Sequence, residues 1–147
     1  MSIVSICAYS QNSFVYSNGE RKVNVEIVFP AEPVERRFDN AFVKQTTETT
    51  DFNGLTFLSN IQQGSKINVP KVLERSLGGI SKITKEYKVG KYKIIEFDFE
   101  AQGDLTKYKV IYYKNGFVLL SVTGIEYPKE SDVEDFFSSV KDRKSVV

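Results

Sequence analysis

The chain lacks histidine entirely and contains a single cysteine, Cys7. The absence of histidine excludes the Ser-His-Asp and Cys-His arrangements of nucleophilic enzymes, and it also excludes imidazole ligands for zinc or copper. One cysteine cannot form a disulfide bond within the chain. Beyond the N-terminal residues, no apolar run is long enough to cross a bilayer, so the sequence predicts no transmembrane segment.

An excess of either charge is also missing. The 147 residues include 20 lysines and arginines and 19 aspartates and glutamates, which leaves a formal net charge of +1. Nucleic-acid binding usually requires a clearly basic face, and no run of like charge forms an interaction tail. We therefore predict no nucleic-acid partner. The length corresponds to one domain with its own core.

Glycine-rich phosphate-binding patterns are absent as well. Neither G-x-G-x-x-G nor G-x-x-x-x-G-K-[ST] occurs in the sequence. We interpret Gly78-Gly79 as a helix stop and Gly90 as part of a turn, because both positions need the backbone freedom of glycine. The sequence therefore predicts no cofactor, and we assign no catalytic, cofactor-binding or metal-binding residue.

The first 13 residues have two interpretations. Residues 3–7 are mainly apolar, and the small residues Ala8 and Ser10 stand at the two positions that a signal peptidase reads. In this interpretation the segment is the remnant of a signal peptide, and cleavage leaves Gln11 as the N-terminus. The segment lacks a basic region, and an irregular or edge-strand N-terminus is the alternative interpretation. Both interpretations place a single folded domain at residues 14–147.

Alternation of apolar and polar residues predicts strands in the N-terminal half. Every second residue of Val23–Phe29 is apolar, which is typical of a half-buried strand, and Pro30 and Pro33 then end its pairing. Further strands are predicted over Ala41–Thr49 and Leu55–Ile61, on either side of the turn Asp51-Phe52-Asn53-Gly54.

Two helices are predicted from apolar residues at helical spacing. The first covers Val69–Leu77, with Asn68 as its N-cap and Gly78-Gly79 as its stop. The second covers Val133–Val140 and follows a capping box, Ser131-x-x-Glu134. Its apolar stripe, which includes two phenylalanines, is interpreted as core because burial of that area is worth several kcal/mol.

Two hairpins connect the helices. The first joins Ile83–Lys88 to Lys91–Phe99 around Val89-Gly90, and the second joins Leu105–Lys114 to Phe117–Thr123 around Asn115-Gly116. A two-residue turn at Asn115-Gly116 places Tyr113 opposite Val118 and Ile111 opposite Leu120 on one face, and Tyr112 opposite Leu119 on the other. Both faces are apolar, so both need cover. The predicted fold class is therefore α+β, an antiparallel sheet of about six to seven strands sandwiched between helices.

The order of these elements resembles the PsbP-like superfamily, in particular its small bacterial members of the PsbP and DcrB type. The resemblance spans residues 14–141 and implies an α/β/α sandwich without a shared catalytic site. PsbP itself carries histidines that this chain lacks, so a metal or photosystem role does not transfer. The matching residues are Phe29-Pro30-Ala31-Glu32-Pro33, Gly90-Lys91-Tyr92, Tyr108–Tyr113, Asn115-Gly116 and Phe136–Val140.

Three carboxylates alternate along one strand at Glu96, Asp98 and Glu100. Carboxylate oxygens can hold a hard cation such as calcium, but calcium sites usually gather their ligands from a sharply turning loop. We therefore favour a solvated strand end with Lys107 and Lys109 as cross-strand neighbours.

The aromatic residues carry the other candidate site. The chain has 8 tyrosines and 11 phenylalanines, and tyrosine is common at protein interfaces. Tyr87 and Tyr92 are predicted to face each other across the first hairpin, and Phe117 to stand at the end of the second. These three residues are the candidate partner-binding patch. Ordinary cross-strand packing is the alternative interpretation, and the one we favour.

Three functions follow as hypotheses. The first is a non-enzymatic, exported or envelope-associated domain that binds a protein partner. The second is a small ligand-binding protein or hydrolase with a cleft lined by Glu96 or Asp98 and by tyrosines, in which pKa values are shifted. The third is an intracellular regulator that resembles the Ran release factor, which requires that residues 1–13 are not a signal remnant.

Overall fold

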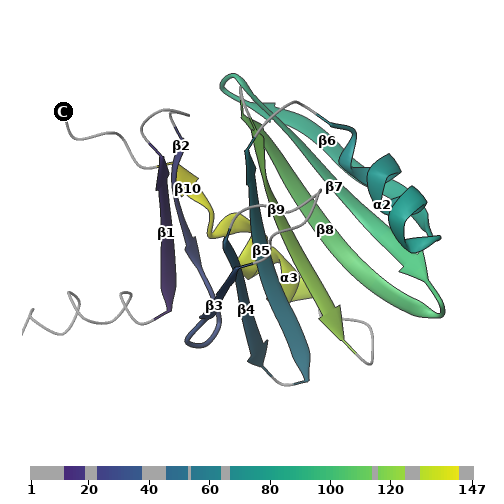
Figure 1. Cartoon of the computed structure of the whole chain (residues 1–147), viewed down its shortest axis with the longest axis horizontal. Coiled ribbons are helices and arrows are strands. Elements are labelled where there is room, and N and C mark those ends of the chain that lie inside the picture. The colour runs from purple at the N-terminus through teal and green to yellow at the C-terminus, as the bar shows by residue number, and fades with distance from the viewer. Residues whose placement is uncertain are drawn as a thin grey trace, which may run out of the picture.

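The computed structural model of the chain describes residues 12–18, 23–37, 46–52, 54–63, 67–113, 116–124 and 130–142. Within these residues, strands form one sheet of seven strands and one of three, and two helices accompany them (Figure 1). The larger sheet has the order β3-β4-β5-β9-β8-β7-β6, and the smaller has the order β1-β2-β10. The strands of the larger sheet are β3 (Val34–Arg37), β4 (Thr46–Phe52), β5 (Leu55–Gln63), β6 (Ile80–Val89), β7 (Tyr92–Ala101), β8 (Asp104–Tyr113) and β9 (Gly116–Gly124). The smaller sheet contains β1 (Ser13–Asn18), β2 (Val23–Val28) and β10 (Lys141–Asp142), and the helices are α2 (Val69–Leu77) and α3 (Glu130–Ser138).

The seven-stranded sheet is antiparallel throughout. Helix α2 covers one face, while α3 and the small sheet cover the other (Figure 1). This arrangement confirms the predicted α+β sandwich. Figure 1 also shows that α3 lies between the two sheets.

Each face of the large sheet has its own apolar core. The core on the α3 side joins residues of α3 and β2 to residues of β5, β7, β8 and β9, and the core on the α2 side joins that helix to β7, β8 and β9. The first core contains Val25, Ile27, Phe29, Leu55, Phe57, Ile61, Ile94, Ile111, Tyr113, Val118, Leu120, Val122, Val133, Phe136 and Phe137. The second contains Val69, Leu73, Ile95, Phe97, Phe99, Val110, Phe117 and Leu119.

The prediction for the first alternating segment is confirmed. Strand β2 covers Val23–Val28, and the inward residues Val25, Ile27 and Phe29 are at most 1% exposed. The prolines separate β2 from β3 as expected. The short strands β1 and β3 were not predicted.

The next hairpin is tighter than predicted. Strand β4 runs to Phe52, which pairs with Leu55, so Asp51 and Phe52 are strand residues and not turn residues. Of the remaining two, residue 53 lies outside the described residues. Gly54 has φ of +78°, a conformation that favours glycine. Of the predicted strand Ala41–Thr49, residues 46–49 lie in β4 and residues 41–45 lie outside the described residues.

Helix α2 has the predicted bounds and caps. The Asn68 Oδ1 accepts a hydrogen bond from Lys71 N at 3.3 Å, and Gly78 closes the helix in the left-handed conformation. The N–H of Val69 donates to the Tyr112 hydroxyl at 3.2 Å, which fixes the start of the helix against β8. Leu77 departs from the predicted buried face, because it is 50% exposed.

Helix α3 differs from its prediction at both ends. It begins at Glu130 and ends at Ser138, so Ser131 lies inside the first turn and is not the N-cap. The predicted capping box is therefore wrong. The predicted stripe is correct, because Val133, Phe136 and Phe137 are at most 7% exposed and Val140 packs against them after the helix has ended.

The predicted pairing of β8 with β9 is wrong by two residues. Tyr113 pairs with Gly116 and Ile111 pairs with Val118, so the connection is formed by residues 114–115, which lie outside the described residues. A shift of two residues leaves every side chain on its predicted face, because side chains alternate with a period of two. The predicted apolar faces are therefore correct although the partners are not.

Candidate functional site

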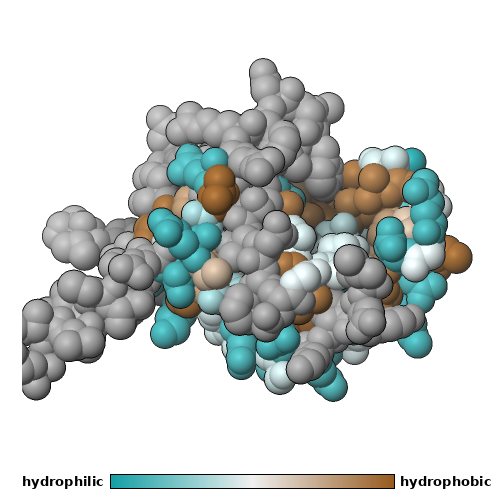
Figure 2. Space-filling model, turned by 90° about the horizontal axis from the view of Figure 1, so that it is seen from below, coloured by the Kyte–Doolittle hydropathy of each residue, from teal (hydrophilic) through white to brown (hydrophobic). Residues whose placement is uncertain are grey.

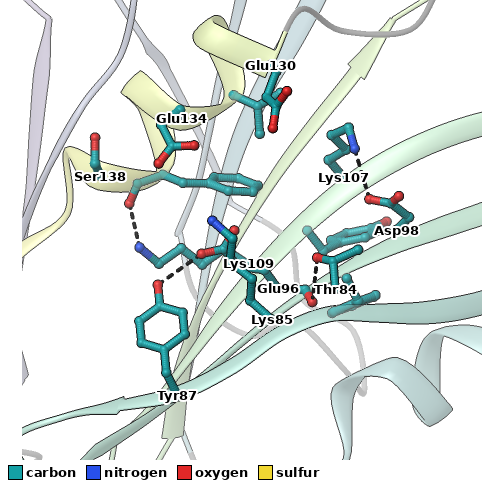
Figure 3. A pocket seen from close by; sticks show the side chains of 14 residues that line it. Thr84, Lys85, Tyr87, Glu96, Asp98, Lys107, Lys109, Glu130, Glu134 and Ser138 are labelled. Carbon is teal, nitrogen blue, oxygen red and sulfur yellow. Dashed lines mark hydrogen bonds and ion pairs between the residues drawn. The ribbon is translucent and has the colours of Figure 1, made fainter.

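A pocket of about 310 Å³ lies between α3 and the strands β6, β7 and β8 (Figure 3). Such a volume is at the lower end of the range for small-molecule sites. Figure 3 shows Glu130 and Glu134 on the helix side of the pocket and Lys85, Glu96 and Lys109 on the sheet side. The lining residues are Thr84, Lys85, Tyr87, Glu96, Phe97, Asp98, Lys107, Tyr108, Lys109, Glu130, Val133, Glu134, Phe137 and Ser138.

Strand alternation places the charged residues of the floor. Glu96 and Asp98 are two apart on β7, so both point to the α3 side, and their partners on β8 are Lys109 and Lys107. A register shift in β6 leaves Thr84 as an extra residue, whose hydroxyl donates to the Glu96 carbonyl at 3.1 Å. The predicted cross-strand lysines are therefore confirmed.

Asp98 is engaged in an ion pair. The Lys107 Nζ lies 3.0 Å from Asp98 Oδ1, and both side chains are about a quarter exposed, at 27% and 28%. The pair neutralises the Asp98 end of the pocket floor and holds both side chains in place.

Tyr87 and Glu96 form a second contact. The Tyr87 hydroxyl donates to Glu96 Oε2 at 2.9 Å. Burial, together with the hydrogen bond and the negative charge of Glu96, raises the pKa of Tyr87 to about 12, and Glu134 adds a smaller effect in the same direction. The carboxylate opposes the formation of a tyrosinate anion beside it.

Lys109 is the buried charge of the site. It is only 8% exposed, and its Nζ donates to the Phe137 carbonyl at 2.7 Å, near the C-terminal end of α3. The ammonium thus meets the negative end of the helix dipole. Burial lowers the pKa of Lys109, the nearby Lys85 lowers it further, and Glu96 and Glu134 oppose the shift.

The three alternating carboxylates do not converge on one point. Glu96 and Asp98 line the pocket and are bonded to Tyr87 and Lys107, whereas Glu100 is exposed and outside the pocket. Within the described residues, no group of three or more Asp, Glu, Cys or His side chains is placed to hold a metal ion.

The candidate partner-binding residues lie in different surroundings. Phe117 is 2% exposed and belongs to the core under α2, so it offers no surface. Tyr87 and Tyr92 are partly buried on the same face, but they are not directly opposite, since Tyr87 pairs with Ile94 and Tyr92 with Val89.

Two functional features were missed from the sequence. The first is the burial of Lys109. The alternation of side chains along the strand could have predicted it, because Lys109 lies on the same face of β8 as the core residues Ile111 and Tyr113. The second is the pair of helix carboxylates: Glu134 was interpreted only as a capping and dipole residue, and Glu130 was given no role. Their position over the sheet depends on how α3 packs.

A further surface lies at the edge strand β6. Among the described strands, β6 pairs only with β7, and Ile80, Ile83 and Val89 are 74%, 51% and 56% exposed. Leu77, at the end of α2, is 50% exposed nearby. Figure 2 shows brown, hydrophobic surface on the side of the molecule where α2 and β6 lie. The lysines Lys82, Lys85 and Lys88 are also exposed on this strand.

Comparison with known proteins identifies a fold and no family. No protein-family model matches the chain. A search of curated proteins found no significant match. The solution structure of cyanobacterial PsbP (CyanoP) from Synechocystis sp. PCC 6803 resembles this chain with a TM-score of 0.57 at 12% identity, covering 90% of this chain and 94% of that one. No helix of the described residues is sufficiently long and apolar to span a membrane. The chain therefore has the PsbP-like fold, as the order of its elements predicted.

Proposed function

We propose that this chain is a non-enzymatic binding domain whose protein partner adds an extended, acidic segment to the edge of β6. The observation that carries the proposal is the exposure of Ile80, Ile83 and Val89 along a strand that pairs on one side only in the described part of the chain. A strand edge with exposed aliphatic side chains is a template for another strand.

The charge of the edge selects the partner. Lys82, Lys85 and Lys88 are exposed at every third position of β6, and the acidic Glu86 is offset by Lys93 at 3.3 Å. A second copy of the same strand would bring lysines against lysines, which is unfavourable for cross-strand neighbours. An acidic segment gains charge attraction in addition to backbone hydrogen bonds and apolar contacts.

We propose no enzymatic role because several of the titratable side chains in the pocket already have bonded partners. Three of its titratable contacts are already formed, because Tyr87 binds Glu96, Lys107 binds Asp98 and Lys109 binds a backbone carbonyl. A general acid or base must be within reach of a substrate proton and poised to exchange it. These groups instead stabilise one another.

The edge proposal is tested by photo-crosslinking in the native cells. A photoreactive amino acid at position 82 or 88 is expected to form an adduct with one protein, through a peptide rich in Asp and Glu. The same amino acid at Gln102, which is exposed in the turn between β7 and β8, is the control. We expect the combined Lys82→Glu and Lys88→Glu change to abolish the adduct from a probe at Val89, which is exposed on the same strand, and Lys71→Glu on α2 to preserve it. Equal adducts from position 102, or an adduct that survives the double charge reversal, would contradict the proposal.

We also propose that the domain works outside the cytoplasm, in the periplasm, the envelope or the medium. The small residues Ala8 and Ser10, at the two positions that a signal peptidase reads, support this. Intact mass from separated cell fractions provides the test. A product that begins at Gln11 in the exported fraction is expected. A cytosolic product that retains Met1 and Cys7 would exclude export and favour the intracellular regulator.

A further inference from the structure

The pocket under α3 contains charges of both signs that are not engaged with one another. In the part of the chain that the structure describes, the side chains of Lys85, Glu130 and Glu134 make no hydrogen bond or ion pair, although all three line the pocket. By contrast, Asp98 and Lys107 are paired, and Glu96 is occupied by Tyr87. Glu96 keeps its negative charge beside Lys109 and across from Lys85, so it partly compensates these two ammonium groups. The charged side chains without a bonded partner are one lysine on β6 and two glutamates on α3.

These unpaired charges lie on opposite sides of the pocket. Figure 3 shows the two carboxylates on the helix side and Lys85 on the sheet side. Lys109 lies near both sides of the pocket, since the charges of Glu134 and Lys85 both affect its pKa. Its ammonium donates a hydrogen bond to the Phe137 carbonyl, and an ammonium has three donors. The sheet side can thus offer N–H groups to an anion while the helix side attracts a cation.

An apolar wall completes the pocket. Val133 and Phe137 on α3 line it, and both are at most 7% exposed. Small-molecule sites typically combine apolar walls with a few polar groups that fix the orientation of the ligand. The pocket volume of about 310 Å³ limits the ligand to a small molecule.

We infer that this pocket binds a small zwitterion, a molecule with one ammonium and one carboxylate such as a free α-amino acid with an apolar side chain. Its carboxylate lies toward Lys85 and Lys109, its ammonium lies toward Glu130 and Glu134, and its side chain lies along Val133 and Phe137. The site shares Lys85 with the partner surface proposed above but does not depend on it, because that surface needs backbone pairing along β6 and no ligand under α3.

Three probe compounds test the two charges separately. L-Phenylalanine carries both charges, phenethylamine lacks the carboxylate, and 3-phenylpropionate lacks the ammonium. In ¹H–¹⁵N NMR titrations we expect L-phenylalanine to shift amides of β6, β7 and α3 in a saturable manner. Each one-charge analogue is expected to bind about fivefold more weakly, the effect of one partly exposed ion pair.

Variants assign each charge to its partner. Lys85→Met is expected to weaken L-phenylalanine binding about fivefold and to leave phenethylamine unchanged. Glu134→Gln is expected to weaken L-phenylalanine similarly and to leave 3-phenylpropionate unchanged. Lys82→Met and Glu100→Gln, which alter exposed charges outside the pocket, are the matched controls and should change nothing.

Three outcomes would overturn the inference. They are equal affinities for the three compounds, shifts confined to residues outside the pocket, and no saturable shift up to the solubility limit of L-phenylalanine. Because Lys82 and Lys88 are not pocket residues, the charge reversal that tests the β6 edge can fail or succeed independently of this result.

Discussion

At the scale of single residues, Tyr87 is the group whose chemistry the fold changes most clearly. Its hydroxyl donates to Glu96, and its pKa is raised to about 12 by burial and by that carboxylate. A raised tyrosine pKa means that the folded protein holds the proton more tightly than the unfolded chain. The stabilisation is therefore complete below pH 10, the unfolded value, and is lost as the pH rises through about 12.

The Glu96→Gln variant tests this contact. We expect the pKa of Tyr87 to fall below about 12 while staying above 10, because burial remains when the carboxylate charge is removed. A pH titration of ring signals in ¹³C-labelled tyrosine provides the measurement, and Glu100→Gln on the same strand is the control. A Tyr87 signal that titrates near 10 in the unaltered protein would show that Tyr87 is neither buried nor bonded to Glu96 in solution.

Predictions for single residues were correct where the alternation of side chains along a strand is enough to decide which face a residue occupies. Alternation placed Glu96 and Asp98 on one face with Lys107 and Lys109 as neighbours, and the structure confirms it. Alternation does not show what lies above that face. The carbonyl that accepts from Lys109 belongs to Phe137, 28 residues later in the chain, and only the packing of α3 brings it there.

At the scale of elements, the junction between α2 and β6 is built on two glycines with different roles. Gly78 ends the helix at φ of +69°, with open space where a Cβ would lie. Gly79 has no positive φ, but a Cβ there would overlap the Glu100 carbonyl and the Phe99 ring. The Glu74 carboxylate also accepts from the backbone N–H and the hydroxyl of Ser81, both at 2.9 Å, which ties the helix to the strand.

The two glycines should therefore respond differently to alanine. Gly78→Ala is expected to cost about 1 kcal/mol, the penalty of the left-handed conformation for a residue with a Cβ. Gly79→Ala is expected to cost more, about 2–3 kcal/mol, because a backbone atom and a buried ring must move. Urea unfolding of both variants gives the comparison. A Gly79→Ala protein as stable as the Gly78→Ala protein would show that β7 can shift without cost.

The predicted elements were most accurate where local signals agree. Helix α2 has a capping side chain, a spaced apolar face and a terminal glycine, and its predicted bounds, Val69–Leu77, match the structure. The hairpin of β8 and β9 was predicted with an error of two residues, because Asn115-Gly116 was taken as the turn whereas Gly116 already pairs with Tyr113. Strand β3, Val34–Arg37, was missed because one valine and three charged residues carry no alternation.

At the scale of the whole molecule, Phe136 connects the two sheets. Its ring lies 5.0 Å from that of Phe29, which follows β2, and 5.2 Å from that of Phe57 on β5. Ser139 adds a polar connection, since its hydroxyl is 3.1 Å from both the N–H and the carbonyl of Val28. The sequence predicted that the α3 stripe is buried, but the ring partners of Phe136 are 79 and 107 residues away along the chain and have no local signature.

Substitution of Phe136 by leucine should loosen the small sheet specifically. We expect Phe136→Leu to cost about 1–2 kcal/mol and to speed hydrogen exchange in β2, because the rings of Phe29 and Phe57 lose their common neighbour. Phe99→Leu is the matched control, since Phe99 is also 2% exposed but belongs to the core under α2. It should cost a similar amount while β2 exchanges as before. Equal acceleration of β2 in both variants would mean that the two cores open together, so that Phe136 contributes to global stability without joining the sheets.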